Sequence, residues 1–193
     1  MKKYLYLSEH WMAENWVNGG VVPLFAASKY RKQDRIEIYT PDENLIDNST
    51  HPVESFRKFG IYIDDTSTII LDNSTIGGKL YPGQVRLERR VEDALVLCMA
   101  NRLSNYIAKG LKKVACVEIQ DVFLLKSALD EQIGTVGIMG PCQYTSGHNR
   151  NHFLKSDLDG WQDEFRIIWP GIDSTDVTVP AGNAIKKWIR GMI

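Results

Sequence analysis

Little cysteine, no long apolar run and almost no net charge limit what this chain can be. Its three cysteines are an odd number, and two of them, Cys98 and Cys116, stand inside apolar runs, as reduced and buried thiols do. No charged and then apolar leader opens the chain, and no apolar run approaches the roughly 18 residues that a membrane-spanning helix needs. We therefore expect a cytoplasmic protein with no membrane partner.

Charge of neither sign predominates. The 23 Lys and Arg residues nearly balance the 24 Asp and Glu residues, and a formal net charge of -1 gives no overall reason to expect nucleic acid or an anionic membrane as a partner. The Gly-x-x-x-x-Gly-Lys phosphate loop and the Gly-x-Ser-x-Gly nucleophile elbow are both missing from the sequence.

The chain does contain enough apolar sequence for a folded core. A length of 193 residues with 44% hydrophobic residues suits a single domain spanning 1–193. Apolar runs predict strands at 3–7, 94–100, 113–119, 135–139, 161–169 and 177–179. Helical spacing and caps predict helices at 10–18 after Ser8, at 101–109, at 122–133 after Asp121, and at 184–193. Strands outnumber helices without regular alternation, which favours an α+β fold; the fold of residues 47–90 stays open.

The stretch 161–169 is the most informative part of the sequence, because its two faces differ. In a strand, the apolar side chains Trp161, Phe165, Ile167 and Trp169 would share one face. The opposite face would then carry the polar side chains Gln162, Glu164 and Arg166. Aromatic anchoring would fix the carboxylate, as a catalytic group requires. The alternative is a half-exposed strand in which Glu164 and Arg166 form a structural pair.

Three segments, in this order, resemble the ADP-ribosyltransferase superfamily. Residues 4–20, a strand and then a helix ending at two glycines, are similar to its opening, and residues 97–101 stand in the place of its second motif strand. Gln162-Asp163-Glu164 resembles its third motif, Gln-x-Glu. The chain is also similar to uncharacterised bacterial proteins that end in a Lys followed by a Trp-Gln-x-Glu-x-Arg strand, here Lys155 and residues 161–166.

The resemblance implies split mixed or antiparallel sheets flanked by short helices, with NAD bound as a substrate. It further implies an ADP-ribosyltransferase acting as a bacterial toxin or phage-defence effector, for which an antitoxin would be a partner. Cleaving the bond between nicotinamide and ribose builds positive charge on the sugar, which a fixed carboxylate at Glu164 would stabilise. The amide of Gln162 would contact the acceptor, and favours a nucleic acid or a protein side chain other than arginine.

The resemblance also suggests which other residues form the site. The first-motif residue that holds NAD stays open among Tyr6, His10 and Arg31, because the Ser-Thr-Ser and His-Tyr patterns of better-known branches are missing. The second-motif strand would contribute Cys98 and Asn101 to NAD binding. Contacts with the acceptor would come from Tyr144, His148, Arg150 and Arg166.

Two further constellations and one non-catalytic function compete with this interpretation. Cys142, His148 and His152 have a spacing that could provide three zinc ligands, but no fourth soft ligand stands nearby and no metal is expected. Acidic groups near Asp121 with Lys126 would suit a metal-dependent nuclease, although Asp121 is better explained as a helix cap. The remaining alternative is a non-catalytic protein-interaction domain.

A cleft next to Glu164 would favour the enzyme, whereas a covered and ion-paired Glu164 would favour the structural pair. On the enzyme interpretation, Glu164→Gln should abolish NAD turnover with little change in thermal stability.

Overall fold

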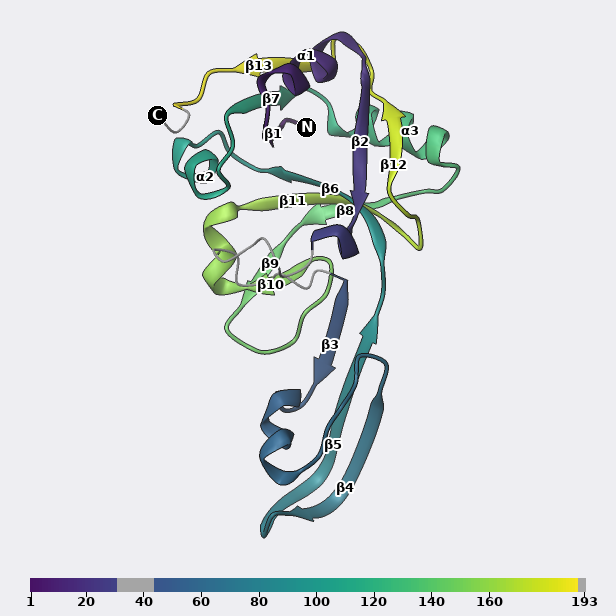
Figure 1. The fold of residues 1–193 in the computed structure, drawn as a ribbon, viewed down its shortest axis with the longest axis vertical. Helices are drawn as coiled ribbons and strands as arrows, with labels where there is room; N and C mark the ends of the chain where they lie inside the picture. The colour runs from purple at the N-terminus through teal and green to yellow at the C-terminus, as the bar shows by residue number, and fades with distance from the viewer. Residues whose placement is uncertain (31–43, 191–193) are drawn as a thin grey trace.

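Strand β6 (Ala94–Ala100) lies at the centre of the protein, as its unbroken apolar sequence predicts. The computed structural model describes residues 1–30 and 44–190. Short helices and mainly antiparallel strands form an α+β fold, which confirms the predicted class. Eight strands build the sheet of the body, and a three-stranded arm projects from it (Figure 1).

The two edges of β6 are paired in different ways. Strand β11 (Glu164–Pro170) follows one edge along its whole length, with Glu164 opposite Ala100, and β8 (Ile138–Pro141) pairs with the outer edge of β11. The other edge is shared: β2 (Val21–Ala26) pairs at Leu95 and Val96, and β1 (Lys3–Leu7) pairs at Ala100. Strands β1 and β2 therefore diverge beside residues 97–99.

Each of the two diverging strands carries the sheet further outward. Strand β1 pairs with β7 (Ala115–Ile119), which in turn pairs with β13 (Ala184–Lys187). Strand β2 pairs with β12 (Thr175–Thr178). All pairings in this eight-stranded sheet are antiparallel.

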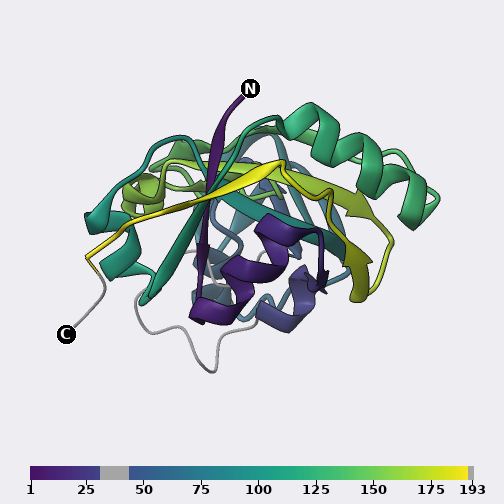
Figure 2. The same ribbon diagram turned by 90° about the horizontal axis from the view of Figure 1, so that it is seen from above.

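The main core lies on one face of the sheet, under helices α1 (His10–Asn18) and α3 (Val122–Ile133), both of which are visible beside the strands from the end opposite the arm (Figure 2). The central strands contribute alternate residues to it: Leu95, Leu97, Met99, Phe165, Ile167 and Trp169. Gly19 ends α1 in the left-handed conformation, and the Asp121 carboxylate caps α3 by accepting from Phe123 N, both as predicted. The predicted cap Ser8 is wrong, since Glu9 occupies that position.

Shorter elements cover the opposite face. They are α2 (Asn105–Gly110), the 3-10 helices η1 (Ala27–Tyr30) and η4 (Asp157–Gln162), and a small parallel sheet of β9 (Gln143–Thr145) and β10 (Leu154–Ser156). Strand β11 directs its even-numbered side chains, including Glu164 and Arg166, away from the main core, because successive residues of a strand face opposite sides.

The arm consists of β3 (Leu45–Ser49), the 3-10 helix η3 (Val53–Phe59), β4 (Thr68–Ile76) and β5 (Lys79–Val91). It has an apolar cluster of its own, formed by Val53, Phe56, Ile63, Tyr81, Val85 and Leu87. At its base, Asp47 and Arg150 exchange backbone hydrogen bonds of 3.1 and 2.8 Å, which join the arm to the loop before β10.

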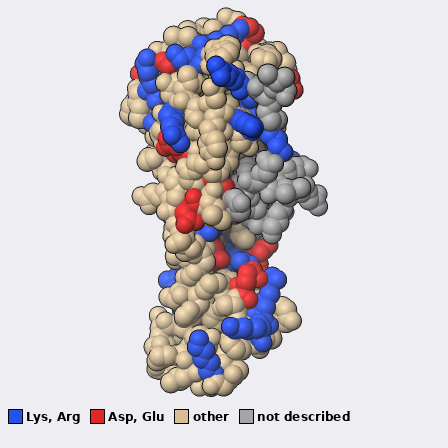
Figure 3. All heavy atoms as spheres, turned by 90° about the vertical axis from the view of Figure 1, so that its left-hand side faces the viewer, with Lys and Arg blue, Asp and Glu red and all other residues tan. Residues whose placement is uncertain are grey.

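The distribution of surface charge and the lengths of the helices agree with the balanced charge and the short apolar runs of the sequence. On the face shown in Figure 3, Lys and Arg side chains are spread over both the body and the arm, with Asp and Glu among them. In the part of the chain that the structure describes, no helix is long and apolar enough to cross a membrane.

Four predicted elements differ in the structure. The helix expected at 101–109 begins only at Asn105, after its cap Ser104, and the strand expected at 135–139 begins only at Ile138. The strand expected at 161–169 begins only at Glu164, because residues 157–162 form η4 and Asp163 adopts a left-handed φ of 48°. The helix expected at 184–193 is wrong, since Ala184–Lys187 form β13 against the outer edge of β7. Pairing with an open sheet edge here outweighs the weak helical pattern of a short segment.

Candidate functional site

A left-handed turn at Asp163 places Glu164 at the first position of β11. Asn101, just after β6, stabilises this turn: its backbone N–H donates to Asp163 O and its side-chain amide donates to Asp163 Oδ1, both at 2.8 Å. Lys3 in turn donates to the side-chain oxygen of Asn101. A left-handed φ is unfavourable for residues other than glycine, and these hydrogen bonds offset that cost at Asp163. The turn that they stabilise sets the direction of the Glu164 side chain.

The Glu164 carboxylate lies between two buried cations. Its Oε1 accepts from Lys155 Nζ at 3.1 Å, and its Oε2 accepts from Arg166 Nε at 2.7 Å. The Cys142 thiol lies 3.6 Å from Oε2. Arg166 is also fixed from the other side, since its Nη1 donates to His152 O at 2.8 Å. The carboxylate therefore has a single well-defined position.

Gln162 belongs to the same network although it is not part of the strand. Its Oε1 accepts from Lys155 Nζ at 2.6 Å, and its Nε2 donates to Asp159 Oδ1 at 3.2 Å. The Lys155 ammonium thus joins both residues of the Gln-x-Glu motif, and Lys155 and Gln162 are each only 1% exposed.

The small parallel sheet brings Lys155 to this position. In its register Lys155 on β10 lies opposite Tyr144 on β9, and both reach Glu164. The Tyr144 hydroxyl accepts from the backbone N–H of Glu164 at 2.8 Å, while the Cys142 backbone N–H donates to Glu164 O at 2.9 Å. Tyr144 on β9 and Cys142 therefore hold the backbone of Glu164, while Lys155 on β10 holds its side chain.

The electrostatic environment keeps Glu164 ionised. Burial raises the pKa of its carboxyl group, but the charges of Arg166 and Lys155 and their hydrogen bonds outweigh burial, so the pKa lies well below the usual range for glutamate. Burial raises the pKa of the Cys142 thiol to about 12 and keeps it neutral. Burial also raises the pKa of the Tyr144 phenol.

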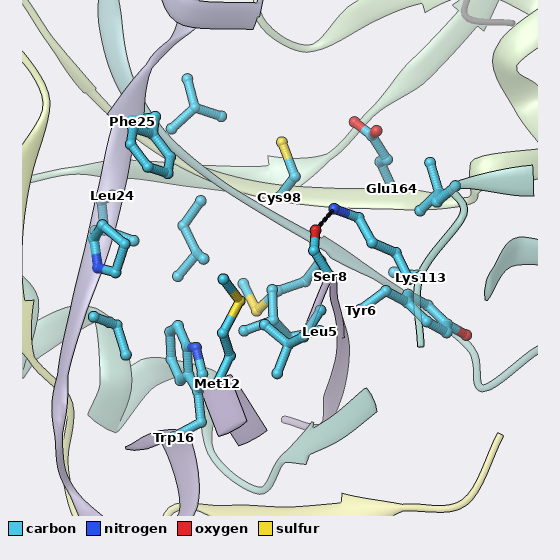
Figure 4. A pocket seen from close by; sticks show the side chains of 18 of the residues that line it. Leu5, Tyr6, Ser8, Met12, Trp16, Leu24, Phe25, Cys98, Lys113 and Glu164 are labelled. Atoms are coloured by element: carbon cyan, nitrogen blue, oxygen red, sulfur yellow. Dashed lines mark hydrogen bonds between the residues drawn. The ribbon is translucent and has the colours of Figure 1, made fainter. Parts of the chain in front are cut away.

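A cavity of about 340 Å³ opens where β1 and β2 diverge from β6, and Glu164 and Gln162 are part of its wall. Its volume is near the lower end of the ~300–1,000 Å³ typical of ligand sites. One end of the cavity is apolar, with Leu5, Met12, Trp16 and Leu24 (Figure 4). The other end is polar, with Ser8, Cys98, Lys113 and Glu164 (Figure 4).

Of the four residues predicted to bind NAD that the structure describes, two line this cavity. They are Tyr6, whose hydroxyl donates to Arg102 O at 3.0 Å, and Cys98 on β6. His10 is exposed at the start of α1, and Asn101 stabilises the Asp163 turn without being part of the cavity wall. Arg31 lies outside the described residues.

The four residues predicted to contact the acceptor are placed in two regions. Tyr144 and Arg166 both hydrogen-bond to Glu164, and neither lines the cavity wall. His148 and Arg150 belong to the base of the arm, where His148 Nε2 lies 2.6 Å from Ser49 O and Arg150 pairs with Asp47. The structure therefore gives Arg166 a role in positioning Glu164.

Sequence reasoning did not identify Ser8, Lys113, Lys155 or Asp159 as members of the site. Lys155 had a signal, since it precedes the Gln-x-Glu strand in the motif. The function of Lys155 depends on the β9–β10 register, which a three-residue strand does not reveal in sequence. Ser8 and Lys113 are joined by the pairing of Leu7 with Ala115, a contact between distant parts of the chain.

The residues of the alternative zinc site and of the alternative nuclease site do not form such sites. The Cys142 thiol is next to Glu164, whereas His148 is at the base of the arm, and no three His, Cys, Asp or Glu side chains among the described residues could hold a metal ion together. The nuclease residues are also engaged elsewhere, since Asp121 caps α3 and Lys126 pairs with Asp130 one helical turn away.

Comparison with known proteins shows no family for this chain. Neither a protein-family model, nor a curated protein, nor a solved structure matches the chain.

Proposed function

We propose that this chain is an NAD-dependent ADP-ribosyltransferase whose essential carboxylate is Glu164. The observation that carries the proposal is the place of Glu164 at the polar end of a cavity whose other end is apolar. Such a cavity suits a ligand with a flat ring at one end and a polar sugar beside it. The divergence of β1 and β2 from a shared central strand supports an ADP-ribosyltransferase-like split sheet.

The role assigned to Glu164 is electrostatic. As nicotinamide leaves with the electron pair of its bond to ribose, positive charge develops on the sugar, and an ionised carboxylate stabilises it. The acceptor atom then forms a bond to the sugar carbon and loses its proton to solvent. A carboxylate has about four acceptor positions, and three partners occupy Glu164, which leaves one for a ribose hydroxyl.

Gln162 acts in this proposal by holding Lys155 and, through it, Glu164. Its amide oxygen and nitrogen are each engaged by a buried charged side chain, Lys155 and Asp159. The acceptor, a nucleic acid or a protein side chain, would approach from the polar end of the cavity. Action as a toxin or phage-defence effector rests on the motif resemblance.

A second candidate function is a non-catalytic protein-interaction domain in which Glu164 and Arg166 form a purely structural pair. It is favoured by one observation: Glu164 is 9% exposed and ion-paired with two buried cations.

Labelled NAD separates the two functions. The protein is incubated with a cell lysate and NAD labelled in its ADP-ribose part, and label is followed into protein, RNA and DNA while free nicotinamide is measured. We expect label transfer by the wild type and by the surface control Glu14→Gln, and none by Glu164→Gln. If the wild type neither transfers label nor releases nicotinamide, the enzyme proposal is wrong and the protein-interaction domain remains.

A further inference from the structure

The polar end of the cavity contains one acidic and one basic side chain. Among the described residues of the cavity wall, these are Glu164 and Lys113. Figure 4 shows both side chains at this end, with Cys98 beside them and the apolar side chains of Leu24 and Trp16 farther away. A ligand bound here would therefore meet a negative charge on one side and a positive charge on the other.

The geometry around Lys113 is fixed by the sheet. Its Nζ donates to Ser8 Oγ at 2.7 Å, and the backbone N–H of the next residue, Val114, donates to Leu7 O at 3.0 Å. Ser8 directly follows β1, whose last residue Leu7 pairs with Ala115 of β7. The ammonium and the hydroxyl thus approach the cavity together from two adjacent strands.

We propose that Lys113 and Ser8 form a subsite for a phosphate group of the nucleotide substrate. The Ser8 oxygen accepts from Lys113, so its own proton can point to a phosphate oxygen, and the positive charge of the ammonium attracts the same anion. Lysine binds phosphate as a compact positive charge. This assignment rests on the proposed function and adds to that function the orientation of the substrate.

The orientation follows from charge and polarity. A phosphate is repelled by the Glu164 carboxylate and attracted by Lys113, so it lies on the Ser8 side of the polar end. The ribose then lies beside Glu164. The nicotinamide ring extends into the apolar end, toward Trp16 and Leu24, where it leaves as a neutral molecule.

Paired ligands with and without a phosphate test the subsite by isothermal titration calorimetry. We expect the wild type to bind nicotinamide mononucleotide roughly tenfold more tightly than nicotinamide riboside, as one charge-assisted contact implies. Lys113→Met should remove this preference, and Lys113→Arg should retain most of it. The matched control is Lys186→Met, because Lys186 pairs with Glu14 on the surface. Circular dichroism establishes that each variant is folded.

Inorganic pyrophosphate serves as a probe that does not depend on NAD chemistry. Pyrophosphate binding that weakens in Lys113→Met and with rising salt supports the subsite, even if the protein does not consume NAD. An unchanged mononucleotide preference in Lys113→Met, or no preference in the wild type, overturns it. If Glu164-dependent NAD turnover is found together with that result, the proposed function stands and only the phosphate assignment is lost.

Discussion

Lys155 and Glu164 form an ion pair between two separate sheets. Lys155 lies on the short parallel sheet, Glu164 begins a strand of the main sheet, and 3.1 Å separate Nζ from Oε1. Both side chains are buried, and the same ammonium reaches Gln162. Because a buried charge that loses its partner is costly, this pair couples the geometry of the site to the stability of the fold.

Replacement of Lys155 by methionine should therefore destabilise the protein by about 3 kcal/mol, since Glu164 loses one of its two cations and the Gln162 oxygen loses its donor. Urea denaturation followed by circular dichroism measures this change. The control Lys186→Met removes an exposed lysine and should change the free energy of unfolding by less than ~1 kcal/mol. Equal effects of the two substitutions would contradict the buried ion pair.

Glu164→Gln should abolish NAD turnover while the cavity still binds nucleotide, because glutamine has the shape of glutamate without its charge. The sequence predicts little change in stability, whereas the structure predicts a loss, since Lys155 and Arg166 remain buried without a carboxylate. Nicotinamide release should be measured at a temperature at which the variant is folded, with Glu14→Gln as control. Wild-type turnover by the folded variant would exclude a catalytic role for Glu164.

Acid should weaken the protein partly through Glu164. Its pKa is lower in the folded than in the unfolded state, so its contribution to stability is complete above the unfolded value of about 4.3 and declines as pH falls toward the folded value. The difference in unfolding free energy between wild type and Glu164→Gln should thus be constant near neutral pH and shrink below pH ~5. Denaturation curves between pH 3 and pH 7 test this, and a difference that grows on acidification would reverse the sign.

Alkylation should distinguish the three thiols. Cys98 is partly exposed and lines the cavity, whereas Cys116 and Cys142 are buried and burial raises the pKa of each thiol to about 12. Iodoacetamide should consequently modify Cys98 first, as thiolate formation and access control the rate. Peptide mass spectrometry identifies the site, and bound nicotinamide mononucleotide should slow the reaction. Modification of Cys142 at the same rate would show that its surroundings open.

Local sequence signals predicted much of the body of the protein. The apolar run at 94–100 is the central strand, and Gly19 and Asp121 end and begin their helices as glycine and aspartate commonly do. Alternation also separated Glu164 and Arg166 from Phe165 within the part of 161–169 that is a strand. These features depend on neighbours in the sequence, which a pattern can capture.

The remaining features depend on contacts between distant segments. The left-handed Asp163 turn is stabilised by Asn101, and it moves Trp161 out of the strand to pack against α2 near Tyr106. Strand β13 forms because β7 offers it an edge. The arm has an apolar cluster of its own in a region where repeated turn formers concealed the long strands β4 and β5.

The parallel pairing of β9 with β10 is only three residues long, and it has a consequence for how this protein can vary. A slip of one residue would turn the Lys155 side chain to the other side and replace it with Leu154 or Ser156. Insertions within 146–153 could lengthen that crossover without harm only if they left this alignment intact. Small changes of length directly next to Lys155 should thus be tolerated far less than changes of residue type in the middle of the same crossover.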